Sequence, residues 1–300
     1  MPRAGFEPAS VALGSSGKEL AKEHVEKILE KFKAFLEVDK LRKPATIANH
    51  IRTAKRLMEK FEVDPSSLTV EEIRAFLAEY RNGNPNTYAN VLKSLRMFFE
   101  FLGKKEVVMG FKYPRVSQPF NEVVKDEDLR KFYHALESPH DRAFFLVLAT
   151  SGLRYGEAAG LKVEEIDFST GMVVPHKNEP RAFGTKNTYI TFVNCEALEA
   201  LKQYLAGRGC YNGVIFNELK GKSGIWYRWS VARQRSGTRI RPKDLRVWFA
   251  WKMGCLGVPD RYIDAFCGRV PRSVLARHYT DYSPERLKEI YDRANLKVLA

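Results

Sequence analysis

The residues best suited to chemistry lie in the last third of the chain. Two pairs of cations, Lys243 with Arg246 and Arg269 with Arg272, precede a Tyr-Thr-Asp-Tyr cluster at 279–282. Lys243 and Arg246 stand three residues apart, so a helix would place both on one face. Arginine can hold phosphate oxygens as charge builds in a transition state, because its guanidinium stays charged and binds two oxygens at once. Cations beside a tyrosine therefore predict a phosphodiester site with a phenol as nucleophile.

A second segment of the same character lies far upstream, in the run TSGLRYGE at 150–157. We expect Arg154 of this run to join Arg246 in a clamp on one phosphate. A simpler interpretation stays open, in which Arg154 forms a buried ion pair with Glu157 or Asp167. We expect Glu157 itself to be structural and to have no part in the chemistry.

A mainly helical second domain must position these side chains. Helical spacing of apolar residues predicts helices at 125–136, 139–153, 195–207, 242–254, 258–267, 271–279 and 283–296. Short β-branched runs at 171–174 and 188–193 predict a small hairpin or a three-stranded sheet. The final amphipathic segment could pack within the chain or on a neighbouring subunit.

Four amphipathic helices between residues 18 and 108 predict a small bundle ahead of that domain. Thr69 and Glu72 form a capping box at the start of one of them. Two prolines and the lack of a helical period make the segment before the second domain a linker. The predicted organisation is a flexible N-terminus 1–17, a helical domain 18–108, a linker 109–121 and a second domain 122–300.

The charge of the chain indicates a polyanionic partner. The 300 residues carry a formal net charge of +14 and give a pI near 9.5. Residues 219–246 hold nine Lys or Arg against one acid, Asp244, with Trp226, Tyr227 and Trp229 among them. A solvated surface is the plain alternative, but a basic patch with aromatics is a common footprint of nucleic-acid binding. The arginines expected to contact DNA are Arg228, Arg233, Arg235, Arg239 and Arg241.

Other classes of protein are excluded by what the sequence lacks. No apolar run approaches the length of a membrane span, and the first residues do not resemble a signal peptide. The four cysteines form no CxxC pattern and have no histidine at zinc spacing, so we expect reduced thiols and no metal.

Four segments together resemble the boxes of the tyrosine recombinases. The run TSGLRYGEAAGL at 150–161 resembles the first box, T-G-x-R-x-x-E-x-x-x-L, which presents a catalytic arginine. KDLR at 243–246 resembles the second box, and CGR at 267–269 resembles the L-G-H/W element. ARHYTDY at 276–282, with ERL at 285–287, resembles the tyrosine box. The boxes follow one another in the family's order, and the four-helix segment is similar to the family's N-terminal core-binding domain.

The resemblance implies a role for each matching residue. The implied catalytic residues are Arg154, Lys186, Lys243, Arg246, Arg269 and Tyr279. Tyr279 aligns with the tyrosine of the family's Y-T-x-x-x-x-E-R-L run, and Tyr282 is its competitor. Lys186 stands where family hairpins carry the general acid for the 5′-hydroxyl leaving group, and Lys177 is the alternative. No metal, cofactor or ATP is implied.

Two positions depart from the commoner family pattern. Lys243 stands where the family more often has His, and Arg269 stands where it has His or Trp. Together they resemble the archaeal virus and plasmid integrases of the fusellovirus type. The departure leaves open which group, if any, acts as a base.

The resemblance also implies a fold and an activity. The expected fold is mainly α with a small β-sheet, built from a four-helix core-binding domain and a C-terminal catalytic domain of the DNA breaking-rejoining type. The expected activity is site-specific recombination by an integrase of an archaeal mobile element, through a 3′-phosphotyrosine and a Holliday junction. Double-stranded DNA attachment sites would be the partner, with four protomers on DNA and a monomer or dimer when free. Such a protein would be cytoplasmic and nucleoid-associated, with no membrane contact.

The first residues suggest which sites would be targeted. Gly5-Phe6-Glu7-Pro8 can be encoded by GGN-TTC-GAA-CCN, which matches the T-arm of a tRNA gene. We hypothesise that residues 1 to about 12 are a translated attachment site, with chance or a binding arm as alternatives. Other functions remain open: an Xer-like chromosome-dimer resolvase, a type IB topoisomerase, or a non-catalytic DNA-binding module.

Overall fold

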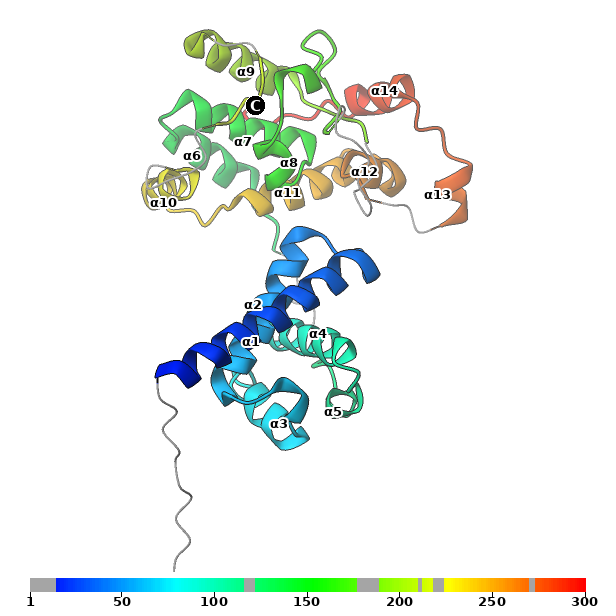
Figure 1. Ribbon diagram of the computed structural model, residues 1–300. Coiled ribbons are helices and arrows are strands. Elements are labelled where there is room, and N and C mark those ends of the chain that lie inside the picture. Colours follow the sequence, from blue (N-terminus) through cyan, green and yellow to red (C-terminus); the bar gives the residue numbers. More distant parts are fainter. Residues whose placement is uncertain (1–14, 116–121, 177–188, 210–211, 218–223, 270–272) are drawn as a thin grey trace, which may run out of the picture. The chain divides into compact units, whose positions relative to one another are not determined.

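The computed structural model describes residues 15–115, 122–176, 189–209, 212–217, 224–269 and 273–300, with side chains from residue 23 onward. The chain forms two compact units, 1–119 and 120–300. Their α-helices are labelled in Figure 1. No helix in the described ranges is long and apolar enough to cross a membrane.

The N-terminal unit is a bundle of helices around a phenylalanine-rich core. Its elements are α1 Ser15–Ala34, the π-helix Phe35–Asp39, α2 Pro44–Phe61, the 3-10 turn Pro65–Ser67, α3 Val70–Ala78, α4 Pro85–Phe101 and α5 Glu106–Met109. Prolines open α2 and α4, where a missing N–H costs nothing. The predicted capping box is present, since Thr69 and Glu72 each bond the other's backbone N–H. The four predicted helices are confirmed, while the π-helix and α5 were not expected.

The second unit is mainly helical with a two-stranded antiparallel sheet, as predicted. Its elements are α6 Asp126–Ala135, α7 Pro139–Ser151, α8 Tyr155–Ala159, the 3-10 turn Val163–Glu165, β1 Met172–Val173, β2 Thr191–Phe192, α9 Cys195–Arg208, α10 Ile225–Ser236, α11 Pro242–Cys255, α12 Asp260–Phe266, α13 Val274–His278 and α14 Pro284–Ala294. Met172 pairs with Phe192, and Val173 with Thr191.

The buried helix α7 is the centre of this unit. Every residue of α7 except Pro139 and Arg142 is buried, in agreement with the apolar run from Ala143 to Ala149. Helices α9 and α11 pack against it, and α10 packs on α6 (Figure 1). Because α7 is enclosed on all sides, its C-terminal turn is a rigid platform for the residues that follow it.

Three expectations about this unit are wrong in detail. The basic segment contains a helix, α10, and its Trp229 is only 1% exposed and packs on Phe132 and Phe144. This tryptophan is therefore core and not a stacking platform for bases. Helix α13 ends at His278, so Tyr279 lies just outside the helix that was predicted to include it.

The final helix packs within its own chain. Leu287, Ile290, Tyr291 and Ala294 of α14 are all buried in the core of the second unit. The Tyr291 hydroxyl donates to the carbonyl oxygen of Thr150 at 2.8 Å. The apolar face of α14 is thus occupied within the subunit.

The turn that ends α7 gives the first testable prediction. Gly152 has φ +65°, and a Cβ there would lie 2.5 Å from Cδ1 of Phe249. We expect Gly152→Ala to lower the free energy of unfolding by roughly 2–5 kcal/mol, from backbone strain plus overpacking. Gly254→Ala is the control, because a Cβ there would meet only Ile263 at 3.9 Å inside a helix. Tryptophan fluorescence in urea reports this unit alone, since all four tryptophans lie at 226–251; equal effects of both substitutions would contradict the prediction.

Candidate active site

Glu157 holds Arg154 at the turn between α7 and α8. The backbone N–H of Arg154 donates to Oε2 of Glu157 and its Nη1 donates to Oε1, both at 2.8 Å. The ion pair considered from the sequence therefore exists with Glu157, whereas Asp167 accepts from Ser169 and Thr170. The Arg154 side chain remains 34% exposed, so its other N–H groups can still meet a ligand.

The helix α11 brings Arg246 to the same turn. Its Nη1 donates to the carbonyl oxygen of Gly152, and its Nη2 donates to that of Cys267 at 2.7 Å. A guanidinium has five N–H donors, so these two bonds orient the group and leave three donors for a ligand. Arg246 thereby connects the end of α7 to the end of α12.

Arg269 completes a group of three arginines. It follows α12, its Nη1 donates to Oδ1 of Asp264 at 3.0 Å, and its side chain is 48% exposed. Arg246, Arg269 and Arg154 all act electrostatically on the buried Cys267 thiol, where burial outweighs them and raises its pKa. The structure thus brings the three predicted arginines together around one point, hereafter the arginine cluster.

The two predicted lysines fare differently. Lys243 lies in the first turn of α11, one turn before Arg246, and is exposed. It forms no ion pair with any residue in the described part of the chain. Lys186 and its alternative Lys177 lie outside the described residues.

Tyr279 is a free phenol at the end of α13. The residue is 77% exposed, and α13 has no buried residue. Its hydroxyl makes no hydrogen bond to a described residue, and α13 lies at the outer edge of the unit (Figure 1). Tyr282, in contrast, donates to the carbonyl oxygen of Ala276 at 2.6 Å and packs on Tyr262. Of the two competitors, only Tyr279 is free to act, and no contact joins it to the arginine cluster here.

Sequence reasoning missed Tyr189, whose hydroxyl donates to Oε2 of Glu157 at 2.8 Å. A signal was present, because alternate residues of a strand point the same way. Thr191 lies two residues on, and its hydroxyl donates to the carbonyl oxygen of Ser151 at the end of α7. The period of two therefore aims Tyr189 toward the same turn as Thr191.

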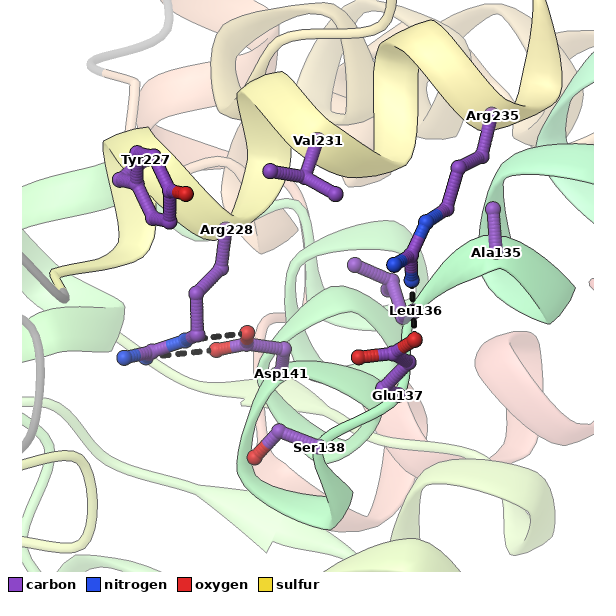
Figure 2. Close-up of a pocket in the computed structure, with 9 residues that line it drawn as sticks. All are labelled: Ala135, Leu136, Glu137, Ser138, Asp141, Tyr227, Arg228, Val231 and Arg235. Atoms are coloured by element: carbon purple, nitrogen blue, oxygen red, sulfur yellow. Dashed lines mark hydrogen bonds and ion pairs between the residues drawn. The ribbon is translucent and has the colours of Figure 1, made fainter.

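The basic patch is partly neutralised by acids from a distant segment. Figure 2 shows Arg228 forming a two-pronged ion pair with the buried Asp141, and Arg235 paired with Glu137 through a single contact. Both pairs line a pocket of about 280 Å³ between α10 and the start of α7. Burial tends to raise the pKa of Asp141, but hydrogen bonds from His140 and Arg228 outweigh it and lower that pKa.

The five arginines expected on DNA therefore divide into two groups. Arg228 and Arg235 have the acidic partners just described, and Arg241 bonds Asp244 at the start of α11. Arg233 and Arg239 form no ion pair with the residues that the structure describes, and Arg239 is exposed. Arg233 and Arg239 are thus the members best placed to meet a polyanion.

This division predicts opposite effects of two substitutions. Arg239→Ala should leave stability unchanged, weaken DNA binding, and reduce the slope of log affinity against log salt by about 0.9, for one lost phosphate contact. Arg228→Ala should instead lower the free energy of unfolding by about 3 kcal/mol, because it leaves the carboxylate of Asp141 buried without its ion pair. Fluorescence anisotropy at several salt concentrations and urea unfolding separate the two effects. A salt slope that changes with Arg228→Ala and not with Arg239→Ala would contradict the assignment.

No group of three His, Cys, Asp or Glu side chains that could hold a metal occurs in the described ranges. The arginine cluster, Lys243 on α11 and the phenol of Tyr279 are the predicted reactive groups that the structure describes. Such a set can bind a phosphate, stabilise charge on its oxygens, and attack its phosphorus.

Comparison with known proteins identifies both units. Residues 122–286 match the Phage integrase family, and residues 28–108 match the family described as Phage integrase, N-terminal SAM-like domain. The chain is 27% identical over 280 residues to the tyrosine recombinase XerA of Pyrococcus furiosus, covering 90% of this chain and 94% of that protein. It is 26% identical over 301 residues to the tyrosine recombinase XerC of Myxococcus xanthus, covering 89% and 97%. Neither relative is a fusellovirus-type integrase, so that narrower resemblance stays a prediction.

A solved structure shares the fold. A lambda integrase tetramer bound to a Holliday junction aligns with a TM-score of 0.61 at 16% identity, covering 89% of this chain and 84% of that chain. The helical catalytic unit with its small sheet is therefore a recurring architecture for this class of protein.

Proposed function

The chain belongs to the phage integrase family of tyrosine recombinases, which are DNA strand transferases, and we propose that it recombines specific DNA sites with Tyr279 as nucleophile. The observation that carries this proposal is the convergence of Arg154, Arg246 and Arg269 from three separate segments around one turn. Each keeps part of its guanidinium unbonded to described residues. Three cations with spare donors at one point fit a phosphate diester better than any neutral ligand.

The reaction follows from these groups. The phenol of Tyr279 gives up its proton to a base or to water, and its oxygen forms a bond to phosphorus. The bond from phosphorus to the 5′ oxygen breaks, and the arginines hold the non-bridging oxygens as their charge grows. The 5′ oxygen takes a proton from a general acid, for which Lys186 is our candidate and Lys177 the alternative. A 3′-phosphotyrosyl ester results. Attack by a 5′-hydroxyl on this ester reverses the step and rejoins DNA without an external energy source.

Tyr279 must reach the arginine cluster for this chemistry to begin. Helix α13 buries none of its residues, so little packing has to be broken when it moves. We propose that binding of DNA, and contacts between protomers on it, bring the phenol to the bound phosphate.

The nucleophile is tested with a nicked suicide DNA substrate, incubated with protein and resolved on a denaturing gel. Wild type should form a covalent protein–DNA band, and Tyr279→Phe should form none, because it lacks the attacking oxygen. Tyr282→Phe is the matched control and should retain the band, since its hydroxyl is occupied by a carbonyl. A band that persists in Tyr279→Phe moves the nucleophile elsewhere, and no band from wild type despite tight binding identifies a mere DNA binder.

The biological setting has two candidates. We favour an integrase of a mobile element, acting at a tRNA gene as four protomers through a Holliday junction. Support for the assembly comes from the fold shared with the lambda integrase tetramer on such a junction. The second candidate, an Xer-type resolvase, is favoured by the two Xer relatives that align over nearly the whole chain.

The gene itself distinguishes these candidates at residues 5–8, which lie outside the described residues. If the N-terminus is a translated attachment site, the codons of Gly5 to Pro8 should read GGG-TTC-GAA-CCN, which contains GGTTCGAACC. The measurement is the DNA sequence of the gene, together with a search of the host genome for a tRNA gene that shares the surrounding bases. Different synonymous codons would remove the support for a tRNA target and favour the Xer-type alternative.

A further inference from the structure

Tyr189 lies where three parts of the catalytic unit meet. It precedes β2, its hydroxyl reaches Glu157 on α8, and its ring lies against Gly268 after α12. We infer that Tyr189 is a positioning residue for the arginine cluster, a role that rests on the proposed function. It acts through Glu157 on Arg154 and through Gly268 on Arg269.

The first connection is a shared carboxylate oxygen. Oε2 of Glu157 accepts both the Tyr189 hydroxyl and the Arg154 backbone N–H, each at 2.8 Å, while Oε1 accepts Nη1 of Arg154. The Glu157 side chain is only 10% exposed, so protein donors must replace much of its hydration. The hydrogen bond from Tyr189 thus fixes the orientation of the Glu157 carboxylate, and this orientation lets the carboxylate bind Arg154.

The second connection is a close approach between a ring and a backbone. Gly268 has φ +57°, and a Cβ there would lie 2.4 Å from Cε1 of Tyr189. The ring therefore occupies the space that a side chain at 268 would need. The neighbours of Gly268 in the chain are Arg269 and Cys267, and the carbonyl oxygen of Cys267 accepts from Arg246. The ring of Tyr189 thus contacts the segment that carries Arg269 and whose Cys267 carbonyl oxygen accepts from Arg246.

Tyr189 serves as a fixed donor and not as a second nucleophile. Burial, followed by the charge of Glu157, raises its pKa far above that of a free phenol, although Arg246 and Arg154 lower it in part. The hydroxyl consequently keeps its proton and directs it at Glu157. In return, this hydroxyl is one of the donors that lower the pKa of Glu157 against the effect of its burial.

The test compares Tyr189→Phe with Tyr204→Phe in the full chain. The control removes a similar buried hydroxyl, which donates to the carbonyl oxygen of Ile215 at 3.2 Å from a ring that packs on His140 and Phe216. We expect Tyr189→Phe to slow single-turnover cleavage of the suicide substrate by about 10- to 100-fold with unchanged DNA affinity, the loss typical of a misplaced catalytic group. Tyr204→Phe should cleave at the wild-type rate.

The pH dependence provides a readout that a purely structural role would not change. Glu157 must be ionised to hold Arg154, and its pKa in the folded protein is lowered. Without the Tyr189 hydroxyl, burial raises the pKa of Glu157. When the pH is lowered, the cleavage rate of Tyr189→Phe should therefore fall at a higher pH than the rate of wild type. An unchanged acid limb would overturn the connection through Glu157.

Coupling to Arg154 completes the test. If Tyr189 acts through Arg154, adding Tyr189→Phe to Arg154→Ala should cause little further loss, and an equal additional loss would overturn the inference. Glu157→Gln, which keeps the size of the side chain, should behave like Tyr189→Phe and serves if the latter does not fold. Wild-type cleavage with an equally fast Tyr189→Phe refutes only this inference. Failure of wild type to form any adduct refutes the proposed function.

Discussion

The catalytic unit depends on the carbonyl group of Gly152. A helix leaves its last carbonyl groups without partners, and at the end of α7 this group accepts from Arg246. The left-handed conformation of Gly152 ends the helix there and brings its Cα against Phe249, one turn beyond Arg246 on α11. One turn thus sets both the packing of α11 and the orientation of its arginine. The chain then enters α8 at Arg154, so two members of the arginine cluster are located by a single backbone bend.

Such a cluster creates a problem of charge. Three guanidinium groups close together repel one another, and partial burial removes the water that would screen them. This repulsion is offset by ion pairs of Glu157 with Arg154 and of Asp264 with Arg269, and by two carbonyl oxygens that accept from Arg246. These partners hold the groups without using all of their donors, and Arg246 receives no carboxylate among the described residues. A bound phosphate would supply the missing negative charge at the member that lacks it, which gives the site a preference for an anion before any chemistry occurs.

The sequence predicted the features that are local. The helix α7 was predicted because of its apolar run from Ala143 to Ala149, and the capping box of Thr69 because its two residues are three apart. The helix α10 was not predicted, because its segment was interpreted from its many charges and not from the helical spacing of Ile225, Trp229 and Ala232. The ion pair between Arg228 and Asp141 could not be predicted either, because the two residues are distant in the sequence and adjacent in space.

The arginines of the site were likewise found from short patterns, because each lies in a recognisable box. Tyr189 was not found in this way, because no residue near it in the sequence indicates that its hydroxyl bonds Glu157. Its importance arises only when β2, α8 and the segment after α12 are brought together. Residues that position others through tertiary contacts leave little local signal, and the alternation that aims Tyr189 and Thr191 at one turn is the most that the sequence contains.

The two tyrosines show how the structure separates positioning from reaction. Tyr189 lies beside the arginine cluster, but burial and Glu157 raise its pKa and hold its proton, so proximity to cations does not make it a nucleophile. Tyr279 has a free hydroxyl and an exposed helix, yet it lies apart from the cations that would assist its ionisation. A phenol becomes a good nucleophile when its hydroxyl is not held by another acceptor and cations nearby favour its ionisation. Under the mechanism proposed above, cleavage requires that α13 move or that a neighbouring protomer supply its phenol, and it would then depend on assembly of the complex on DNA.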